Sequence, residues 1–297
     1  MPARLLDGVA TANQIRAEIA PAVAAFTARA GRPPGLGIVL VGDDPASDIY
    51  VRGKGKAAGE SGLRADLERL PATTSLAQLL DVVDRLNRSD AHDGILVQSP
   101  LPAALGDDAE RRVFDAIDPA KDVDGFHPVN AGRLAAGLPG LVPCTPLGCI
   151  ILTKSVHPSL EGMSAIVIGR SNLVGRPLVQ LLLNENATVT IAHSRSRDLP
   201  KLCAEADLVY AAVGKPEMVR GRWIKPGATV IDVGINRIPT AEGKTKLVGD
   251  VAFQEALGVA GAITPVPGGV GQMTVACLLV NTLRAACSIH KLPAPGV

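Results

Sequence analysis

The chain alternates short runs of aliphatic residues with longer segments in which aliphatic residues recur at helical spacing. Near the N-terminus, Ile15, Ile19 and Val23 fall on one stripe of a helix, which predicts an amphipathic helix. The run Leu36 to Val41 is aliphatic apart from Gly37, which predicts a strand buried on both faces. The alternation of these two patterns predicts an α/β protein.

The same alternation continues over most of the chain. Strands are predicted at residues 36–41, 63–70, 94–98, 165–168, 187–191, 208–213, 229–233, 246–248 and 261–263. Helices are predicted at residues 11–29, 46–61, 76–86 and 271–290, with further helices beginning near 143 and 175. Strands joined by helices at this spacing favour parallel sheets with right-handed crossovers.

A segment rich in Asp, Pro and Gly at residues 118–128 interrupts this alternation and predicts a passage between two domains. The length of 297 residues is sufficient for two domains of ordinary size. We expect residues 1–122, together with about 272–297, to form an N-terminal α/β domain with a parallel sheet. Residues 123–271 are expected to form a Rossmann-type domain, and the C-terminal helix is expected to pack back on the first domain.

The second predicted domain contains a nucleotide-binding pattern. A run of small and β-branched residues ends at Gly169, and a helical pattern with Leu178 and Leu182 begins at Gly175. Glycines in such a turn let the backbone approach a phosphate, and the helix N-terminus offers free N–H groups and a positive dipole end. The spacing differs from G-x-G-x-x-G, so the glycines alone are a weak signal.

The end of the next predicted strand bears on the choice of dinucleotide. Sites that prefer NAD usually place an acid there for the ribose 2′-hydroxyl, whereas NADP sites place basic or small polar residues. This chain has Ser194, Arg195 and Arg197 before its first acid, Asp198, and Arg170 lies in the first turn. The pattern predicts NADP; the alternative is a basic loop that faces solvent.

Composition narrows the class of protein. Hydrophobic residues make up 47% and aromatic residues 2%, so the cores must be aliphatic. A net charge of +1 argues against nucleic acid or a membrane surface as a charge-driven partner. The longest aliphatic runs are too short to span a bilayer, and the N-terminus does not resemble a signal peptide. Five cysteines without a C-x-x-C pair, and scattered histidines, predict no disulfide framework, no metal and a cytoplasmic protein.

The first predicted domain carries the candidate reactive groups. Tyr50 and Lys54 are four residues apart on a predicted helix and so share a face, where a lysine beside a phenol can serve in proton transfer. The alternative is a solvated basic face. Gln98 closes a predicted strand, where side chains point toward ligand crevices, although it could be an ordinary polar residue at a strand end. Of Asp122 and Asp124, one could accept hydrogen bonds from an amino-heterocycle and the other could cap a turn.

Taken together, these stretches resemble the bifunctional methylenetetrahydrofolate dehydrogenase/methenyltetrahydrofolate cyclohydrolase family of the FolD type. The resemblance covers nearly the whole chain. The motifs that carry it are Pro45-Ala46-Ser47 with Tyr50-Val51 and Lys54, residues 94–98 with Pro100-Leu101-Pro102, and residues 121–128, 169–177, 248–251 and 263–271 with Met273-Thr274.

The resemblance implies roles for individual residues. The implied catalytic residues are Lys54, Tyr50, Gln98 and Asp124, of which Asp124 would hold the amino-pterin ring. The implied contacts to NADP are Gly169, Arg170, Ser171, Val174, Gly175, Ser194, Arg195 and Ile235. The implied contacts to the folate substrate are Tyr50, Lys54, Val97, Gln98, Ser99, Asp124, Pro267, Gly268 and Gly269. No metal is implied.

The resemblance also implies the activity. The enzyme would oxidise 5,10-methylenetetrahydrofolate with NADP and then hydrolyse 5,10-methenyltetrahydrofolate to 10-formyltetrahydrofolate, as a homodimer in one-carbon metabolism. Three departures from the family pattern are visible. Ser99 stands where the family usually has leucine, and Gln272 stands where proline is common. Arg52-Gly53 and Gly55 give a more flexible catalytic helix than the family pattern implies. The competing hypotheses are another NADP-dependent two-domain dehydrogenase and a catalytically silent nucleotide-binding protein. Neither explains why Tyr50, Lys54, Gln98 and Asp124 occur together.

Overall fold

The structure is a computed structural model that describes residues 2–239 and 244–293. The chain forms two compact units. Unit 1 comprises Met1–Ala12 and Thr145–Thr274, and unit 2 comprises Asn13–Cys144 and Val275–Val297. The passages therefore lie near residues 144 and 274, later than the predicted 122 and 271. The first twelve residues belong to unit 1 because their short strand β1, Arg4–Leu5, pairs with β11, Ala262–Ile263.

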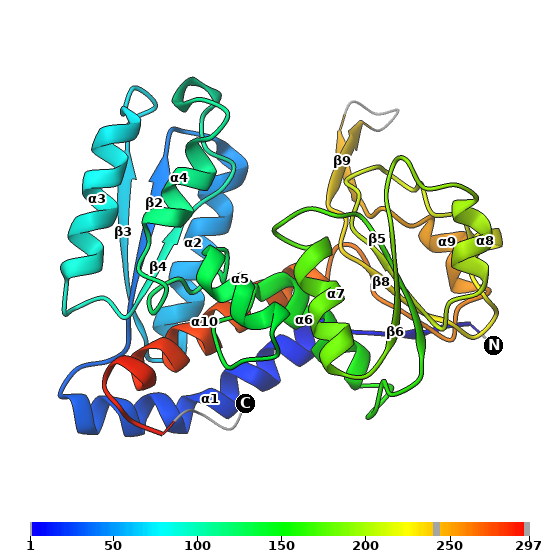
Figure 1. Ribbon diagram of the computed structural model, residues 1–297, viewed down its shortest axis with the longest axis horizontal. Helices are drawn as coiled ribbons and strands as arrows, with labels where there is room; N and C mark the ends of the chain where they lie inside the picture. The colour runs from blue at the N-terminus through cyan, green and yellow to red at the C-terminus, as the bar shows by residue number, and fades with distance from the viewer. Residues whose placement is uncertain (1, 240–243, 294–297) are drawn as a thin grey trace. The chain divides into compact units, whose positions relative to one another are not determined.

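Unit 2 is built on a three-stranded parallel sheet in the order β3-β2-β4. The strands are β2, Gly35–Val41, β3, Arg64–Leu70, and β4, Gly94–Val97. Every residue of the central strand β2 is buried, as its aliphatic run predicts. The helices α2, Pro45–Glu60, and α3, Leu76–Arg88, lie on opposite faces of the sheet (Figure 1).

Local sequence explains where the two helices of this sheet begin. The Asp44 carboxylate caps α2 by accepting the Ser47 N–H at 2.7 Å, and Pro45 occupies the first helical turn. Ser75 and Gln78 form a reciprocal capping box at the start of α3. The start of α2 is thus fixed by residues next to the helix itself, and this start sets where the later turns of α2 place Tyr50 and Lys54.

Unit 1 is built on a six-stranded parallel sheet in the order β1-β11-β8-β7-β5-β6. Besides β1 and β11 its strands are β5, Ser164–Ile168, β6, Thr188–Ala192, β7, Leu208–Ala211, and β8, Thr229–Asp232. Its helices are α6, Cys144–Lys154, α7, Gly175–Asn184, α8, Leu199–Ala204, and α9, Phe253–Leu257. Figure 1 shows α6 and α7 on one face of the sheet and α8 and α9 on the other.

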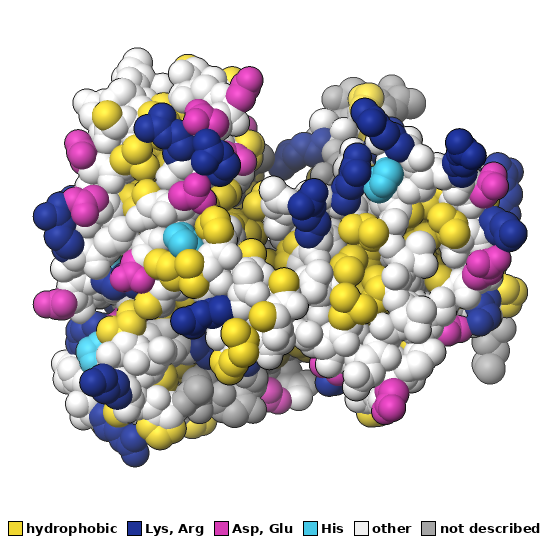
Figure 2. Space-filling model, viewed as in Figure 1, with side chains coloured by type: hydrophobic (Ala, Val, Ile, Leu, Met, Phe, Trp, Pro, Cys, Tyr) yellow, Lys and Arg dark blue, Asp and Glu magenta, His cyan; other side chains and the backbone are white. Residues whose placement is uncertain are grey.

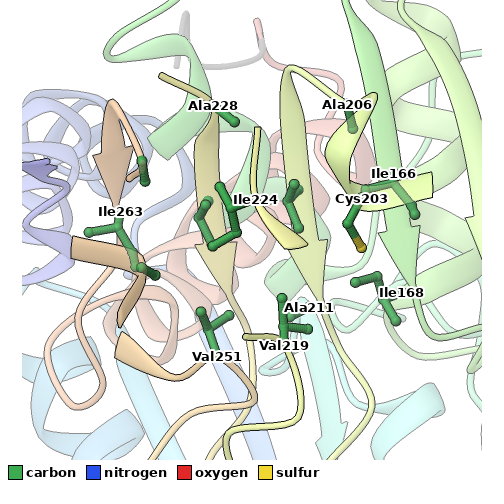
Figure 3. Close-up of a cluster of buried hydrophobic side chains, with 14 of the residues drawn as sticks. Ile166, Ile168, Cys203, Ala206, Ala211, Val219, Ile224, Ala228, Val251 and Ile263 are labelled. Atoms are coloured by element: carbon green, nitrogen blue, oxygen red, sulfur yellow. The ribbon is translucent and has the colours of Figure 1, made fainter. Parts of the chain in front are cut away.

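Small and β-branched side chains fill the core on one face of this sheet. Ile166 and Ile168 of β5 and Ala211 of β7 pack with Cys203 of α8 and Val251, all nearly inaccessible (Figure 3). Such side chains pack closely on a parallel sheet without aromatic rings, which is how a chain with few aromatic residues still builds a dense core. The α/β class with parallel sheets is therefore confirmed.

The C-terminal helix α10, Val270–Ile289, belongs to unit 2 from Val275 onward. It packs there on the first predicted domain, since His290 just beyond it meets Phe26 of α1, Gly8–Ala30, edge-to-face at 5.2 Å. By length and composition alone α10 could cross a membrane. Most of the helix is buried within the fold, as in the core helix of a globular unit.

Several short helices and strands are not predicted by the sequence patterns. These are α4, Ala109–Ala116, α5, Pro128–Ala135, the single 3₁₀ turns Ala103–Leu105 and Gly221–Trp223, and the strand β9, Asn236–Pro239. The strand β10, Thr245–Val248, lies outside the main sheet, because it pairs antiparallel with β9 in a separate two-stranded ribbon. Such short segments hold too few residues for a periodic signal.

Candidate active site

The centre of the candidate site in unit 2 is Lys54, which is only 8% exposed. Its ammonium Nζ donates a hydrogen bond to Gln98 Oε1 at 2.9 Å. Gln98 follows β4, and its Nε2 donates to the main-chain oxygen of Ser99 at 2.6 Å. Both bonds require the same orientation of the Gln98 amide, with the oxygen toward Lys54. The structure therefore brings these two predicted residues into direct contact.

The other predicted residues near Lys54 differ in accessibility. Tyr50 lies one turn earlier on α2 and is 41% exposed, so its phenol is available to solvent or a ligand. Ser99 is half-buried, whereas Val97 is 2% exposed and belongs to the sheet core. Any contact of Val97 with a ligand would therefore involve its main chain.

Asp122 and Asp124 have different environments, which settles which of them caps the turn. The buried Asp122 carboxylate accepts the main-chain N–H groups of Phe126 and His127 at 3.2 and 2.8 Å, and Asn130 Nδ2 at 2.9 Å. Its hydrogen-bonding capacity is used within the turn. Asp122 is therefore the turn cap, and Asp124 stays the predicted contact to the amino-pterin ring.

Asp124 is half-buried and lies within electrostatic range of Lys54. Burial raises the pKa of Asp124 to about 6, while the Lys54 ammonium acts to lower it and the nearby Asp122 to raise it. Desolvation of the charged form outweighs the attraction to the lysine. The carboxyl group consequently titrates close to neutrality, where a change of protonation state can affect ligand binding.

The segment that carries Asp124 is fixed by a residue that the sequence patterns did not single out. Asn281, on α10, is fully buried, and its Nδ2 donates to the main-chain oxygens of Val123 and Val142, both at 2.8 Å. On the other side of Asp124, a side chain on Gly125 would meet Pro143 N at 2.6 Å. The sequence signal for Asn281 is an amide within a mostly apolar helix, because a buried amide needs hydrogen-bond partners.

The raised pKa of Asp124 predicts a stability effect of replacing it with asparagine. Because the folded state raises this pKa above its ordinary value of 3.8, the native carboxyl holds its proton more tightly than the unfolded one. Its ionisation therefore removes stability as pH rises from about 4 to about 6. An asparagine side chain cannot ionise, so we expect the melting temperature of Asp124→Asn to exceed that of the wild type by about 2–5 °C more at pH 8 than at pH 4. Differential scanning calorimetry at both pH values checks this, and an equal difference at the two would contradict it.

In unit 1 the turn after β5 has the close packing of a nucleotide-binding turn. Gly169 has φ of 123°, and a side chain there would lie 2.1 Å from the Ala212 main-chain oxygen. A side chain on Gly175 would lie 2.2 Å from the Gly169 oxygen. Ser171 Oγ accepts the N–H of Val174 at 3.1 Å and that of Gly175 at 3.4 Å at the start of α7. Both glycines are thus required by backbone approach, as the sequence pattern predicts.

Basic and hydroxyl side chains are accessible at the end of the neighbouring strand β6. Ser194 and Arg195 are exposed there, and Arg170 is exposed in the turn after β5. Figure 2 shows Lys and Arg side chains gathered near a histidine on the visible face of this unit. Exposed cations that precede the first acid after the strand suit a phosphate on the ribose rather than a free hydroxyl. This donor set, together with the tight glycine turn, fits NADP.

Two buried carboxylates organise the loops that follow β7 and β8. Asp250 accepts the main-chain N–H groups of residues 213, 214 and 215 at 2.6–2.9 Å and Asn236 Nδ2 at 2.9 Å. Asp232 accepts those of Gly234, Asp250 and Val251 at 2.8–3.0 Å. Burial raises the pKa of Asp232 to about 7, opposed by these three hydrogen bonds. Neither aspartate was singled out as a site residue from sequence, although each lies in a conspicuous glycine-containing motif.

Ile235 and the segment rich in Pro and Gly at residues 264–271 also lie in unit 1. Ile235 is 46% exposed, and its Cδ1 would lie 3.3 Å from a side chain on Gly271. Pro267 is exposed, Gly268 is half-buried, and Gly269 is buried against Pro265. The main-chain oxygen of Gly268 accepts the Gly8 N–H at 2.9 Å. The segment is thus a well-anchored loop with an accessible proline, next to an exposed isoleucine.

Comparison with known proteins identifies a family for the segment that carries Lys54 and Gln98 and for the segment that carries the Gly169 turn. A family model described as tetrahydrofolate dehydrogenase/cyclohydrolase, catalytic domain, matches residues 6–124, and the NAD(P)-binding domain of the same family matches residues 143–290. The bifunctional protein FolD of Bradyrhizobium diazoefficiens is 69% identical over 297 residues, which is the whole of both chains.

Solved structures give the same result. The FolD methylenetetrahydrofolate dehydrogenase/cyclohydrolase of Campylobacter jejuni is 43% identical, with a TM-score of 0.90 over 96% of this chain and 99% of that one. The enzyme of Trypanosoma brucei, solved with NADP cofactor and an inhibitor, is 39% identical, with a TM-score of 0.92 over 98% and 99% of the two chains. The chain therefore belongs to the bifunctional tetrahydrofolate dehydrogenase/cyclohydrolase family of the FolD type.

Proposed function

We propose that this chain oxidises 5,10-methylenetetrahydrofolate with NADP⁺ and hydrolyses the resulting 5,10-methenyltetrahydrofolate at a site centred on Lys54. The family assignment supports both activities, and the single observation that supports the site is the Lys54–Gln98 hydrogen bond in a largely buried setting. In the first reaction the nicotinamide accepts a hydride from the one-carbon bridge of the folate. In this step the protein mainly orients the substrate and excludes water.

The second reaction requires movement of protons. Water adds to the bridging carbon of the methenyl cation, the bond from that carbon to one folate nitrogen breaks, and one proton is released overall. We infer that Lys54 Nζ transfers protons during this step while Gln98 Oε1 holds it in place and Tyr50 supports the substrate from the same helix face. Asp124, as carboxylate, accepts hydrogen bonds from the amino-pterin ring.

We assign the remaining predicted contacts as follows. Ser171, Val174 and the two turn glycines receive the dinucleotide phosphates at the start of α7. Arg170, Ser194 and Arg195 receive the ribose phosphate, and Ile235 packs on the cofactor. Main-chain Val97, together with Ser99 and Pro267 to Gly269, contacts the folate. The exposure of Arg170, Ser194, Arg195, Ile235 and Pro267, together with the tight backbone approach at Gly169 and Gly175, supports the assignment.

The assignment of the ribose phosphate makes a prediction about cofactor choice. Arg170→Ala and Ser194→Ala should each raise KM for NADP by about tenfold, because a charge-assisted hydrogen bond to phosphate is lost, and should change KM for NAD by less than about twofold. Initial rates with each cofactor measure this. Arg29→Ala, which removes an exposed positive charge at the end of α1, is the control. Equal losses for NADP and NAD would contradict the assignment.

We further propose a cytoplasmic homodimer that takes no nucleic acid and no membrane as partner. The near-neutral net charge supports the absence of charge-driven partners. The strand β6 ends the six-stranded sheet with Ile191 40% exposed, and Leu183 of the neighbouring α7 is 47% exposed. Such an apolar sheet edge favours contact with a second subunit. Light scattering on the purified protein measures the oligomeric state.

An absorbance assay tests the proposed function as a whole. Purified protein is mixed with 5,10-methylenetetrahydrofolate and either NADP⁺ or NAD⁺, and nicotinamide reduction is followed. The decay of added 5,10-methenyltetrahydrofolate is followed separately. Reduction with NADP⁺ and accelerated decay are both expected. Reduction without accelerated decay would remove the role given to Lys54, and the absence of both signals would refute the proposed activity.

A further inference from the structure

A chain of hydrogen bonds continues from Lys54 beyond Gln98 to an acidic residue that has no assigned role. Gln98 Nε2 donates to the Ser99 main-chain oxygen at 2.6 Å, and the Ser99 hydroxyl donates to the carboxylate of Glu110. The same carboxylate oxygen, Oε1, accepts the Leu101 N–H at 3.2 Å. One carboxylate therefore binds the turn after β4 at two points, one on either side of Pro100.

Glu110 is well placed to hold this turn. It lies in the first turn of α4, where a negative side chain is favoured by the helix dipole. The helix is anchored in turn by Val113 and Phe114, which are both buried. Glu110 itself is half-buried, so its hydrogen bonds compete less with water than those of a fully exposed carboxylate. A carboxylate also makes stronger hydrogen bonds than a neutral acceptor.

The orientation of the Gln98 amide depends on this turn. With Nε2 facing the Ser99 oxygen, Oε1 faces the Lys54 ammonium and accepts a hydrogen bond from it. In the reversed orientation, the amide oxygen would face a carbonyl oxygen and the NH₂ group would face an ammonium, and both contacts are repulsive. The position of the Ser99 carbonyl therefore selects the rotamer in which Gln98 supports Lys54.

We propose that Glu110 and Ser99 are positioning residues for hydrolysis, which hold the turn after β4 so that Gln98 presents its amide oxygen to Lys54. This rests on the proposed function. Loss of the hydrogen bonds from Ser99 and Leu101 to Glu110 should slow the step in which Lys54 transfers protons. It should slow hydride transfer less, because hydride transfer depends chiefly on the placement of the folate and nicotinamide rings. The effect appears in kcat for hydrolysis rather than in KM for the folate.

The test compares four variants with the wild type in the two absorbance assays. Glu110→Ala is expected to lower kcat for the hydrolysis of methenyltetrahydrofolate by about ten- to a hundredfold and to lower the dehydrogenase kcat by less than about threefold. Glu110→Gln keeps an oxygen that can accept from Ser99 and Leu101, so its hydrolysis rate should stay within about threefold of the wild type. Ser99→Ala should lower the hydrolysis rate, and the Ser99→Ala/Glu110→Ala double variant should be no slower than Glu110→Ala alone.

Asp115→Ala is the matched control, because Asp115 is an exposed acid on the same helix whose partner is Arg111 on that helix. Calorimetry of every variant separates a loss of folding from a loss of rate. Equal loss of both activities in Glu110→Ala, or a hydrolysis rate like that of Asp115→Ala, would overturn the positioning role. A wild-type protein without either activity would instead refute the proposed function, so the two failures are distinguishable.

Discussion

Replacement of Lys54 by glutamine should abolish hydrolysis of methenyltetrahydrofolate, with kcat lower by about 10²–10⁴-fold. Glutamine has nearly the length of lysine but has no proton to transfer at neutral pH. Its amide can still donate to Gln98 Oε1, so the helix and the turn after β4 should remain in place. Most of the loss should therefore appear in kcat rather than in KM.

The control for this variant is another lysine on the same helix. Lys56 is 78% exposed and has Glu60, at 3.7 Å, as its ion-pair partner, so Lys56→Gln removes the same charge without touching the site. Its hydrolysis rate should match the wild type, and the circular dichroism and melting temperature of both variants should match as well. A folded Lys54→Gln protein that still hydrolyses methenyltetrahydrofolate at the wild-type rate would refute the role given to Lys54.

Replacement of Asp124 by asparagine should raise KM for the folate substrate by about 30- to 100-fold. The expected loss is that of a hydrogen bond to a charged acceptor, worth about 2–3 kcal/mol in a desolvated site. KM for NADP should not change, because the residues proposed to bind it lie on other segments. Initial rates with each substrate varied in turn separate the two effects.

The pH dependence gives a second measurement on the same residue. The pKa of Asp124 is raised to about 6, so the carboxylate predominates above this pH and the neutral acid below it. For the wild type, KM for the folate should therefore rise as pH falls through about 6, while Asp124→Asn should show a flat profile there. Asp115→Asn, on the exposed face of α4, should keep the wild-type profile. An inflection that persists in Asp124→Asn would assign the titration to another group.

The sequence predicts much of the framework of both units because the central strands β2 and β5 are aliphatic runs and the helices α1, α2, α3 and α10 are long. The run at 36–41 is buried along its whole length as β2, and the Gly169 turn has the positive φ that its glycine implies. The sequence also predicts the local setting of Lys54 and Gln98, because Lys54 lies on a predicted helix and Gln98 closes a predicted strand. Their direct contact is not predictable from spacing, because it joins residues 44 positions apart.

The residues whose roles the sequence does not predict interact with partners that are distant in the chain. Glu110 acts on a turn that precedes it by about ten residues, and no local pattern marks such a contact. Asn281 binds the main-chain oxygens of Val123 and Val142, more than 130 positions away, so its role becomes visible only in the folded chain. The distinction between Asp122 and Asp124 likewise required the turn geometry, because both are aspartates in one Asp- and Gly-rich segment.

The two buried aspartates of unit 1 have a consequence for how the loops around Ile235 open. Asp232 and Asp250 together bind main-chain N–H groups from three separate segments, so none of these segments can leave without breaking hydrogen bonds to a buried carboxyl group. Such a network opens as one cooperative unit rather than loop by loop. In hydrogen-exchange measurements, the amides of Val213, Gly214, Gly234 and Val251 should thus share one protection free energy, although they come from distant parts of the chain.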